Sequence, residues 1–407
     1  MKALYSLLLR LAAPLSLARL WWRGRREPGY REGILERFGK YSTKAPGKLL
    51  WIHAVSVGEA RAAAPLVSAL KAALPDYGML ITCTTAAGRQ TLAEVYADQV
   101  MVAYLPHDYP GAVRRFLRHF RPRLGVLIET EVWPNLLDAC AGQGIPVVLA
   151  NARMSEKSAR GYERWAGLFA PAFASLAHVC AQSDADAQRL RALGAPNVEV
   201  TGNLKFDVEH SDSQLKQGRE WRERLGRPVI LLASTREGEE KLLLEALPPW
   251  DGKLLVVAVP RHSRRFDEVA QWAQSRRTLN DTPPATDRVY LGDTMGEMAF
   301  YFAACHVAVI GGSFLPLGGQ NLIEALAAGT PAIIGPSMYN FAEAARLAVE
   351  ADAAVQVRDA PEAIRAALEL LNDPQRQETM ARAGRILCEA HRGATKQHLA
   401  VCLDILK

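Results

Sequence analysis

The chain has 407 residues, 49% of them apolar and 23% charged, so it is long enough for two globular domains and does not have the composition of a disordered protein. Its six cysteines form no CxxC pair and no cleavable signal is recognisable, so neither a disulfide framework nor a cysteine zinc site is indicated, and a reducing, cytosolic environment is expected. The net charge of +6 lies in residues 1–40, which hold nine Lys and Arg against three Glu, whereas the rest of the chain is balanced; this distribution argues against a nucleic-acid binder.

The first segment combines apolar residues at helical spacing with a basic end. Arg10 and Arg19 interrupt its apolar run, which disfavours a buried transmembrane span. The apolar stripe and its aromatic and basic border consist of Leu4, Leu8, Leu11, Leu15, Ala18, Trp21, Trp22, Arg23, Arg25 and Arg26. We predict a monotopic helix in one leaflet of an anionic membrane. An uncleaved signal, a helix packed on the body and a transmembrane span are the alternatives.

From Leu49 onward, short apolar runs alternate with longer amphipathic stretches, which predicts βα repetition and a mainly parallel sheet. The pattern restarts after GNLKFD, at 202–207, so we predict two doubly wound domains with 208–220 as the linker. The runs that read as strands are 49–55, 79–85, 124–130, 146–152 and 178–183, then 228–235, 253–260, 289–293, 306–312, 330–335 and 353–357. The helical stretches of the first half are 59–74, 86–97, 133–142, a long stretch to about 176, and 184–193.

The turn after the first apolar run carries a candidate general base. WIHAVSVGE places Ser56, Gly58 and Glu59 between a strand and a helix, at the sheet edge where doubly wound proteins bind ligands. A carboxylate there can remove a proton from a hydroxyl. It can equally be a helix-start residue that only stabilises the helix dipole, and spacing alone leaves both readings open.

Two further candidates follow other strands of the first half. In LIETEVWPN, Glu129 and Glu131 lie on the same side if the strand continues through them. Neither a DxD-like motif nor a histidine accompanies them, so a metal is disfavoured. Lys205 in GNLKFD can neutralise a phosphate or an acidic sugar, although a lone lysine is by default a solvated surface charge.

The second half contains a glycine-rich constellation. A strand ends at Gly311 and Gly312, a second glycine pair follows at 318–319, and a helix is expected to begin near Gln320, with Asn321 and Glu324 at its start. Glycines allow close approach to a ligand, and a helix start suits a phosphate. Arg261 and the segment 294–297 follow two other strands, so the pattern predicts a nucleotide pocket; simple turns and helix caps are the alternative.

Together these runs closely resemble the transferases of 3-deoxy-D-manno-octulosonic acid (Kdo) that act in lipopolysaccharide assembly. The matching runs cover nearly the whole chain in order: RLWWRGR, ERFG, HAVSVGE, ETEVWP, NARMSEKS, GNLKFD, VPRH, MGE, GGSFLPLGGQNLIE and GTPAIIGPSMYNF. One departure is Ala325, where many relatives have proline.

The resemblance implies a GT-B fold, with two Rossmann-like domains facing a central cleft. It implies an N-terminal membrane segment at 1–40, an acceptor-binding domain at 41–205, and a CMP-sugar-binding domain with C-terminal helices at 206–407. The implied activity is inverting, metal-independent transfer of Kdo from CMP-Kdo to a lipid A precursor, without a cofactor or nucleic acid. The implied location is the cytoplasmic face of the inner membrane of a Gram-negative-type bacterium.

The resemblance also assigns residue roles. Glu59 becomes the proton acceptor, and Glu129 and Lys205 become stabilisers of the transition state. The implied CMP contacts are Pro260, Arg261, Met295, Gly296, Glu297, Asn321, Leu322, Ile323 and Glu324, with possible donor-loop contacts at Gly312, Ser313, Gly318 and Gly319. A sugar-nucleotide epimerase or hydrolase on the same scaffold is the alternative enzyme, and a membrane-bound nucleotide-sensing adaptor is the non-enzymatic one.

Overall fold

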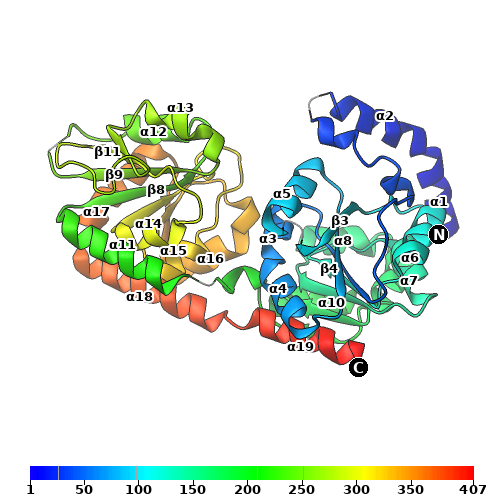
Figure 1. The fold of residues 1–407 in the computed structure, drawn as a ribbon. Helices are drawn as coiled ribbons and strands as arrows, with labels where there is room; N and C mark the ends of the chain where they lie inside the picture. Colours follow the sequence, from blue (N-terminus) through cyan, green and yellow to red (C-terminus); the bar gives the residue numbers. More distant parts are fainter. Residues whose placement is uncertain (26, 97–98, 209, 251) are drawn as a thin grey trace. The chain divides into compact units, whose positions relative to one another are not determined.

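The computed structural model describes residues 1–25, 27–96, 99–208, 210–250 and 252–407. The chain forms two α/β units, unit 1 with residues 1–207 and 393–407, and unit 2 with residues 208–392 (Figure 1). The C-terminal helix α19 (Ala394–Leu406) therefore belongs to unit 1, not to the second domain as predicted. Ala394 and Cys402 are buried in the core of unit 1, and His398 Nε2 accepts a hydrogen bond from the Asn151 amide at 2.8 Å. These long-range contacts have no local sequence signature.

Unit 1 is built on a parallel seven-stranded sheet of order β3-β2-β1-β4-β5-β6-β7. Its central strands are buried on both faces, which explains their continuous apolar runs. The short edge strands β3 and β7 were not predicted. The strands are β1 (Leu49–His53), β2 (Gly78–Cys83), β3 (Met101–Tyr104), β4 (Leu124–Ile128), β5 (Val147–Ala152), β6 (His178–Ala181) and β7 (Val198–Val200).

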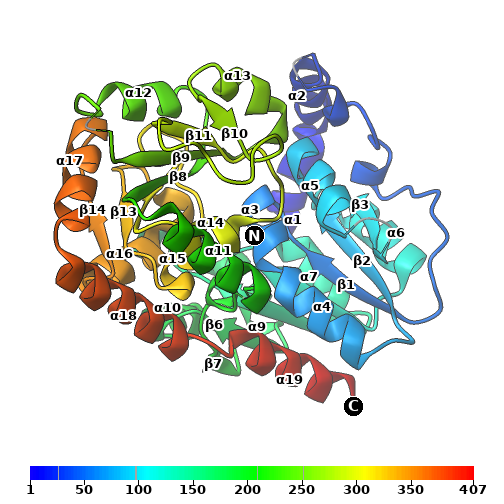
Figure 2. The same cartoon turned by 60° about the vertical axis from the view of Figure 1, so that its left-hand side comes forward.

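Helices cover both faces of this sheet (Figures 1 and 2). The helix predicted over 59–74 is divided at Ala63, because Pro65 in the first turn of α4 has no N–H to continue the ladder of α3. Helix α6 was not predicted, and residue 97 of the stretch 86–97 lies outside the described residues. The helices are α3 (Val57–Ala62), α4 (Ala64–Ala73), α5 (Ala86–Tyr96), α6 (Pro110–Phe120), α7 (Pro134–Ala141), α8 (Glu156–Glu163), α9 (Ala166–Ala174) and α10 (Asp184–Ala192). The 3₁₀ turns are η1 (Pro28–Tyr30), η2 (Glu36–Phe38) and η4 (Leu204–Phe206).

The N-terminal segment is a pair of helices, α1 (Lys2–Leu11) and α2 (Ala13–Arg23), that bend by 48° at Ala12, just before Pro14. No single helix in the described part of the chain is both long and apolar enough to cross a membrane, although this bent pair passes the same test when taken together. Arg26, predicted as part of the basic border, lies outside the described residues.

Unit 2 repeats the architecture with a parallel sheet of order β10-β11-β9-β8-β12-β13-β14. Six of its strands follow the predicted apolar runs, and the two-residue edge strand β10 was not predicted. The strands are β8 (Val229–Thr235), β9 (Leu255–Pro260), β10 (Ser275–Arg276), β11 (Val289–Leu291), β12 (Val307–Ile310), β13 (Ala332–Ile334) and β14 (Ala354–Gln356).

The predicted linker at 208–220 is instead largely helical, because α11 (Asp212–Leu225) packs on α14 (Met298–Ala304) through Gly218 and the buried Trp221. The helix expected to begin near Gln320 is the short α15 (Ile323–Ala328). The other helices are α12 (Glu239–Glu245), α13 (Phe266–Ala270), α16 (Ala342–Glu350), α17 (Ala360–Leu371) and α18 (Pro374–Ala390), with the 3₁₀ turns η5 (Ser263–Arg265) and η6 (Tyr339–Phe341).

Each sheet reverses its strand order at one point, between β1 and β4 in unit 1 and between β8 and β12 in unit 2. Loops that leave parallel strands at such a point diverge to opposite faces of the sheet and leave room for a ligand. The loop after β1 leads to Glu59, and Glu129 directly follows β4. In unit 2 the loop after β8 runs from Arg236 to Gly238 and leads to Glu239, and the loop after β12 begins at Gly311 and includes Phe314. The topology therefore places the candidate chemistry of each unit at its reversal point.

Candidate active site and nucleotide pocket

Glu59 lies in the first turn of α3 and folds back onto the start of its own helix. Its Oε2 accepts a hydrogen bond from the Val55 amide at 2.7 Å, and its Oε1 accepts one from Ser56 Oγ at 2.9 Å. Ser56 Oγ in turn accepts the Glu59 amide at 3.3 Å, which gives a variant of the capping box in which the carboxylate accepts the amide before the N-cap instead of the N-cap amide. The helix-start reading is therefore correct as a description of the geometry. It does not exclude base chemistry, because a carboxylate has about four acceptor positions and only two are used.

The environment of Glu59 disfavours its charged form. Burial is the main cause, the negative charges of Glu129 and Glu131 add to it, and together they raise its pKa to about 7 despite the opposing Val55 and Ser56 hydrogen bonds. A carboxylate with a pKa close to neutral is well matched to accept a proton from a hydroxyl and release it again. The three glutamates thus form one electrostatic cluster.

Glu129 and Lys205 form an ion pair within this cluster. Glu129 Oε1 lies 3.2 Å from Lys205 Nζ, and the two side chains are only 20% and 15% exposed. Glu129 has a φ of +67°, a left-handed conformation that is uncommon outside glycine, so the strand ends at Ile128 and does not continue through Glu131. Glu131 instead accepts a hydrogen bond from Trp133 Nε1 at 2.6 Å, and burial raises its pKa. The condition under which both glutamates would share one strand face is therefore not met.

Lys205 is placed by a residue that the sequence analysis quoted but did not assign. Asn151 is the last residue but one of β5, is completely buried and has a φ of +52°. Its Oδ1 accepts the Leu204 amide at 3.0 Å, and its carbonyl accepts Gln182 Nε2 at 2.9 Å. Gln182 Oε1 also accepts Asn203 Nδ2, so this polar network fixes the turn η4 that carries Lys205. Asparagine tolerates the left-handed conformation, and that preference was the only signal in the sequence.

In unit 2 a pocket of about 490 Å³ opens beyond the ends of β8, β9 and β11. A volume of this size is within the range of about 300–1,000 Å³ that is common for small-molecule sites. Five of the predicted nucleotide contacts line it: Pro260, Arg261, Met295, Gly296 and Glu324. The prediction from separate strand ends thus converges on one pocket in the structure.

The other predicted contacts lie outside the lining of this pocket. Leu322 and Ile323 are fully buried, backbone included, so neither presents a surface to a ligand in this structure. Glu297 accepts hydrogen bonds from Thr294 and, at 3.5 Å, from Arg277, whose guanidinium lies over the Phe300 ring. Asn321 Nδ2 donates to Glu324 Oε1 at 2.9 Å and so fixes the orientation of the Glu324 carboxylate.

The glycine loop after β12 is a scaffold rather than an open surface. Gly312, Gly318 and Gly319 are buried and have φ values between +68° and +88°. Ser313 is completely buried, its hydroxyl donates to the Ile310 carbonyl and accepts the Gly335 amide, and its side chain is therefore not available as a donor contact. Contacts between this loop and the sugar nucleotide stay a prediction.

Ser234 is a pocket residue that the sequence analysis missed. It lines the pocket at the end of β8, has a φ of +55° and sits at a register shift between β8 and β9. A non-glycine residue held in this conformation costs about 1–3 kcal/mol and persists only where the surroundings enforce it, often at functional sites. A serine in a strand end gives no such signal in the sequence.

Comparison with known proteins identifies relatives along the whole chain. The family model for 3-deoxy-D-manno-octulosonic-acid transferases (kdotransferases) matches residues 32–208. The 3-deoxy-D-manno-octulosonic acid transferase of Bordetella pertussis is 46% identical, with 100% of this chain and 99% of the relative covered. That of Haemophilus influenzae is 34% identical over 99% of this chain and 97% of the relative.

Among solved structures, UDP-GlcNAc 2-epimerase from Neisseria meningitidis, bound to UDP-GlcNAc, has a TM-score of 0.57 at 16% identity. The match covers 88% of this chain and 100% of the epimerase. At this identity the likeness concerns the fold alone. It agrees with the two doubly wound α/β units and with the GT-B class.

Proposed function

The chain belongs to the 3-deoxy-D-manno-octulosonic acid transferase family, and from this premise we propose which of its residues carry the reaction. As a member of this family it is a glycosyltransferase that moves Kdo from CMP-Kdo to an acceptor glycolipid in lipopolysaccharide biosynthesis. The epimerase alternative has only a distant fold similarity in its favour.

In the proposed mechanism unit 1 provides the acceptor chemistry. Glu59 removes the proton from a sugar hydroxyl of the lipid A precursor while that oxygen attacks the anomeric carbon of Kdo and CMP leaves, which inverts the configuration. The observation that carries this assignment is the placement of Glu59 at the reversal point of the sheet, with a pKa of about 7, beside the Glu129–Lys205 pair. Lys205 offers a positive charge to the carboxylate or phosphate of the donor, and Glu129 holds Lys205 in place.

The donor chemistry is assigned to unit 2. Arg261 is proposed to stabilise the phosphate of CMP, and Glu324 to accept hydrogen bonds from the ribose hydroxyls. Among the described residues, no group of three or more His, Cys, Asp or Glu side chains is arranged to hold a metal ion. CMP is a monophosphate leaving group, which needs less neutralisation than a diphosphate, so transfer without a metal or cofactor stays our prediction.

Mass spectrometry of the lipid product tests the proposed reaction directly. The purified protein is incubated with a tetra-acylated lipid A precursor and a source of CMP-Kdo. The expected result is a product heavier by one or more Kdo units, and the mass increment counts them. Release of free Kdo without a heavier lipid would identify a hydrolase instead.

The pH dependence of transfer provides a separate prediction. A base must be deprotonated to act, so kcat/KM should rise with pH up to the pKa of Glu59, at about 7, and level off above it. Removing the negative charge of Glu129 lowers that pKa, because Glu129 is the largest electrostatic cause of its rise. In Glu129→Gln the acidic limb of the profile should therefore move to lower pH, even though the plateau falls.

The matched control for this shift is Glu237→Gln, which removes a half-exposed carboxylate from unit 2. Its pH profile should coincide with that of the unchanged protein. An acidic limb that stays in place in Glu129→Gln would show that the limb does not belong to Glu59.

Attachment to a membrane surface is proposed for the helices α1 and α2, because their polar side packs on the protein. Ser6 is buried and donates to Asn135 Oδ1 at 3.0 Å, and Tyr5 donates to Asp108 Oδ2 at 3.1 Å. The outward side holds leucines and tryptophans that are 51–73% exposed: Leu4, Leu7, Leu8, Leu11, Leu15, Trp21 and Trp22. An apolar face directed at solvent is the reverse of what a helix of a water-soluble domain shows.

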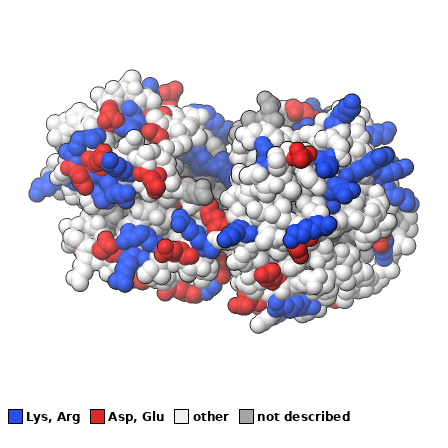
Figure 3. Space-filling view, turned by 60° about the horizontal axis from the view of Figure 1, so that its bottom comes forward, with Lys and Arg blue, Asp and Glu red and all other residues white. Residues whose placement is uncertain are grey.

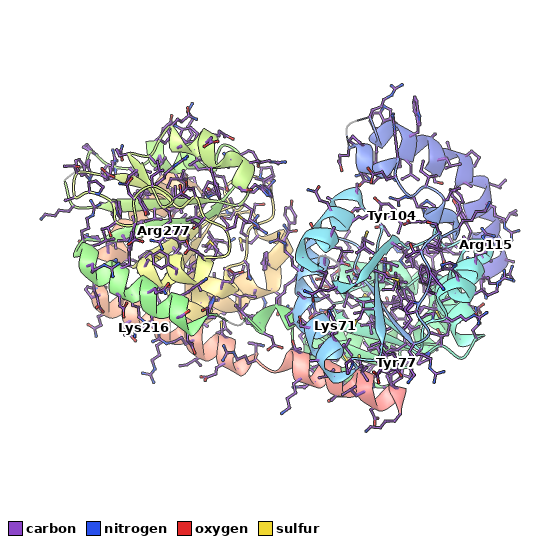
Figure 4. The ribbon with its side chains drawn as sticks, in the orientation of Figure 1. Lys71, Tyr77, Tyr104, Arg115, Lys216 and Arg277 are labelled. Carbon is purple, nitrogen blue, oxygen red and sulfur yellow. The ribbon has the colours of Figure 1, made fainter. Side chains whose placement is uncertain are left out.

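Helix α6 adds positive charge to the same unit. No acidic residue occurs between Asp108 and Glu129, and the interval contains five exposed arginines: Arg114, Arg115, Arg118, Arg121 and Arg123. Lys and Arg side chains gather at the right-hand edge of Figure 3, on the unit that carries α6, and Figure 4 shows Arg115 on the outer side of this helix. Although residues 41–407 carry no net charge, their charges are unevenly distributed and these arginines form a basic surface. Such a surface suits the anionic cytoplasmic leaflet of the inner membrane, which is our proposed location.

Vesicle binding tests this attachment. Changing Leu8, Leu11 and Leu15 to glutamate should reduce binding to phosphatidylglycerol vesicles at least about tenfold, since each buried leucine contributes about 1.5–3 kcal/mol. Transfer to acceptor in detergent micelles should persist. Leu279→Glu is the control, because Leu279 is 72% exposed, as Leu15 is at 73%, but lies in unit 2. Equal vesicle binding by the triple variant and the control would contradict the proposal.

A further inference from the structure

Two adjacent glutamates at the start of α12 are completely buried but have different partners. Glu239 and Glu240 both have 0% of their surface exposed. They follow the loop from β8, one side of the reversal point of the unit 2 sheet, and the glycine loop after β12 lies on the other side. Of these two glutamates, only Glu239 accepts hydrogen bonds from both loops.

Glu239 accepts three backbone N–H groups. Its Oε2 accepts the Arg236 amide at 2.9 Å and the Gly312 amide at 2.5 Å, and its Oε1 accepts the Phe314 amide at 3.0 Å. Among the described residues it forms no ion pair, so its charge is balanced by these amide dipoles. Hydrogen bonds to an ionised acceptor are about twice as strong as neutral ones, and this carboxylate accepts three of them from the backbone.

The glycine loop in turn orders the segment that leads to the pocket. The Gly311 and Gly312 carbonyls accept the Gln320 and Gly319 amides at 3.0 and 2.7 Å. Gly311 also lies so close to the end of β8 that an added Cβ would stand 2.5 Å from Thr235 Cα. The chain then continues through Asn321 to Glu324, which lines the pocket. A shift of Gly312 would therefore displace the Glu324 carboxylate.

Glu240 is as fully buried as Glu239, but its contacts are purely structural. It accepts Thr235 Oγ1 at 2.6 Å and forms a bidentate ion pair with Arg265 at 2.6 and 3.0 Å. None of these partners belongs to the glycine loop. The chain thus provides its own matched control one residue away.

We propose that Glu239 is a positioning residue for the donor: it holds the glycine loop across the reversal point of the unit 2 sheet and thereby fixes Glu324 for the nucleotide of CMP-Kdo. The inference rests on the proposed function of the pocket in unit 2. It predicts a defect in donor binding, not in acceptor binding or in the proton transfer at Glu59.

The experiment compares Glu239→Gln with Glu240→Gln in the whole chain of residues 1–407. Glutamine keeps the size of the side chain but turns an N–H₂ group toward backbone donors. We expect Glu239→Gln to weaken CMP binding, measured by calorimetry, about tenfold or more, to raise the KM for CMP-Kdo with little change in the KM for acceptor, and to accelerate amide exchange at 311–320. Glu240→Gln should lower the melting temperature but leave CMP affinity within about twofold.

Equal loss of CMP affinity in both variants, or no loss in Glu239→Gln, would overturn the proposal. If Glu239→Gln does not fold, the same binding measurements are made with Glu239→Asp, and amide exchange is measured in the unchanged protein. There the Gly312 and Phe314 amides must exchange much more slowly than exposed loop amides. Rapid exchange of these two amides would refute the proposal that Glu239 holds the glycine loop. Failure of the unchanged protein to bind CMP would refute the nucleotide pocket itself, which is a different outcome.

Discussion

Glu59→Gln is expected to lower kcat for Kdo transfer by about 10²–10⁴-fold, the usual contribution of a positioned general base. Glutamine has nearly the same shape, so its carbonyl oxygen can still accept the Val55 amide and its amide can still meet Ser56 Oγ. What it loses is the ability to take a proton. CMP affinity should stay unchanged, because the nucleotide pocket lies in unit 2.

Comparing this substitution with Ser56→Ala distinguishes the two roles of Glu59, helix cap and general base, which its hydrogen bonds alone do not separate. Ser56→Ala removes the Ser56–Glu59 contacts but keeps the carboxylate, and loss of such a cap costs about 0.5–2 kcal/mol of stability. If Glu59 were only a cap, Ser56→Ala and Glu59→Gln would both lower the melting temperature slightly and leave kcat within a few-fold of the unchanged protein. If Glu59 is the base, only Glu59→Gln loses transfer, and quantification of the lipid product by mass spectrometry distinguishes the two cases.

The sequence predicted the fold class well because the central strands are buried on both faces. Such strands appear as continuous apolar runs, and the residues that follow them must lie at the binding edge of the sheet, which led to Glu59 and Glu129. Edge strands and amphipathic helices with few apolar residues were harder to recognise. Helix α11 resembled a linker because its buried side depends on little more than Gly218 and Trp221.

The missed site residues have a common physical character. Asn151 acts on Leu204, 53 positions away, and Glu239 acts on Gly312, 73 positions away, both through hydrogen bonds to backbone amides. Every residue except proline can supply a backbone N–H, so the partner carries almost no sequence signal. His398 is similar, because it accepts a hydrogen bond from the Asn151 amide and so helps to attach the C-terminal helix α19 to unit 1. Sequence reasoning therefore found the groups proposed to react and missed the groups that position them.

Removal of the Lys205 amine is the second change with a large expected effect. Lys205→Met should lower kcat about 10²–10³-fold, comparable to the loss of a preorganised electrostatic donor. It should also move the acidic limb of the pH profile to higher pH, because Glu129 then lies unpaired near Glu59 and further disfavours its ionised form. This shift is opposite in sign to that expected for Glu129→Gln.

The double variant Lys205→Met/Glu129→Gln decides whether the lysine acts on the reaction or only on Glu129. Because it removes both charges together, the pKa of Glu59 should return toward a lower value and the acidic limb should move back. Transfer at the plateau should nevertheless stay low, since the positive charge offered to the donor is still absent. Lys71→Met, at a partly exposed lysine on α4 whose Nζ donates to Gln99, controls for loss of a positive charge elsewhere in unit 1 (Figure 4). Recovery of the plateau rate in the double variant would mean that Lys205 only neutralises Glu129. The ion pair between them would then be structural, and Lys205 would have no direct role in the reaction.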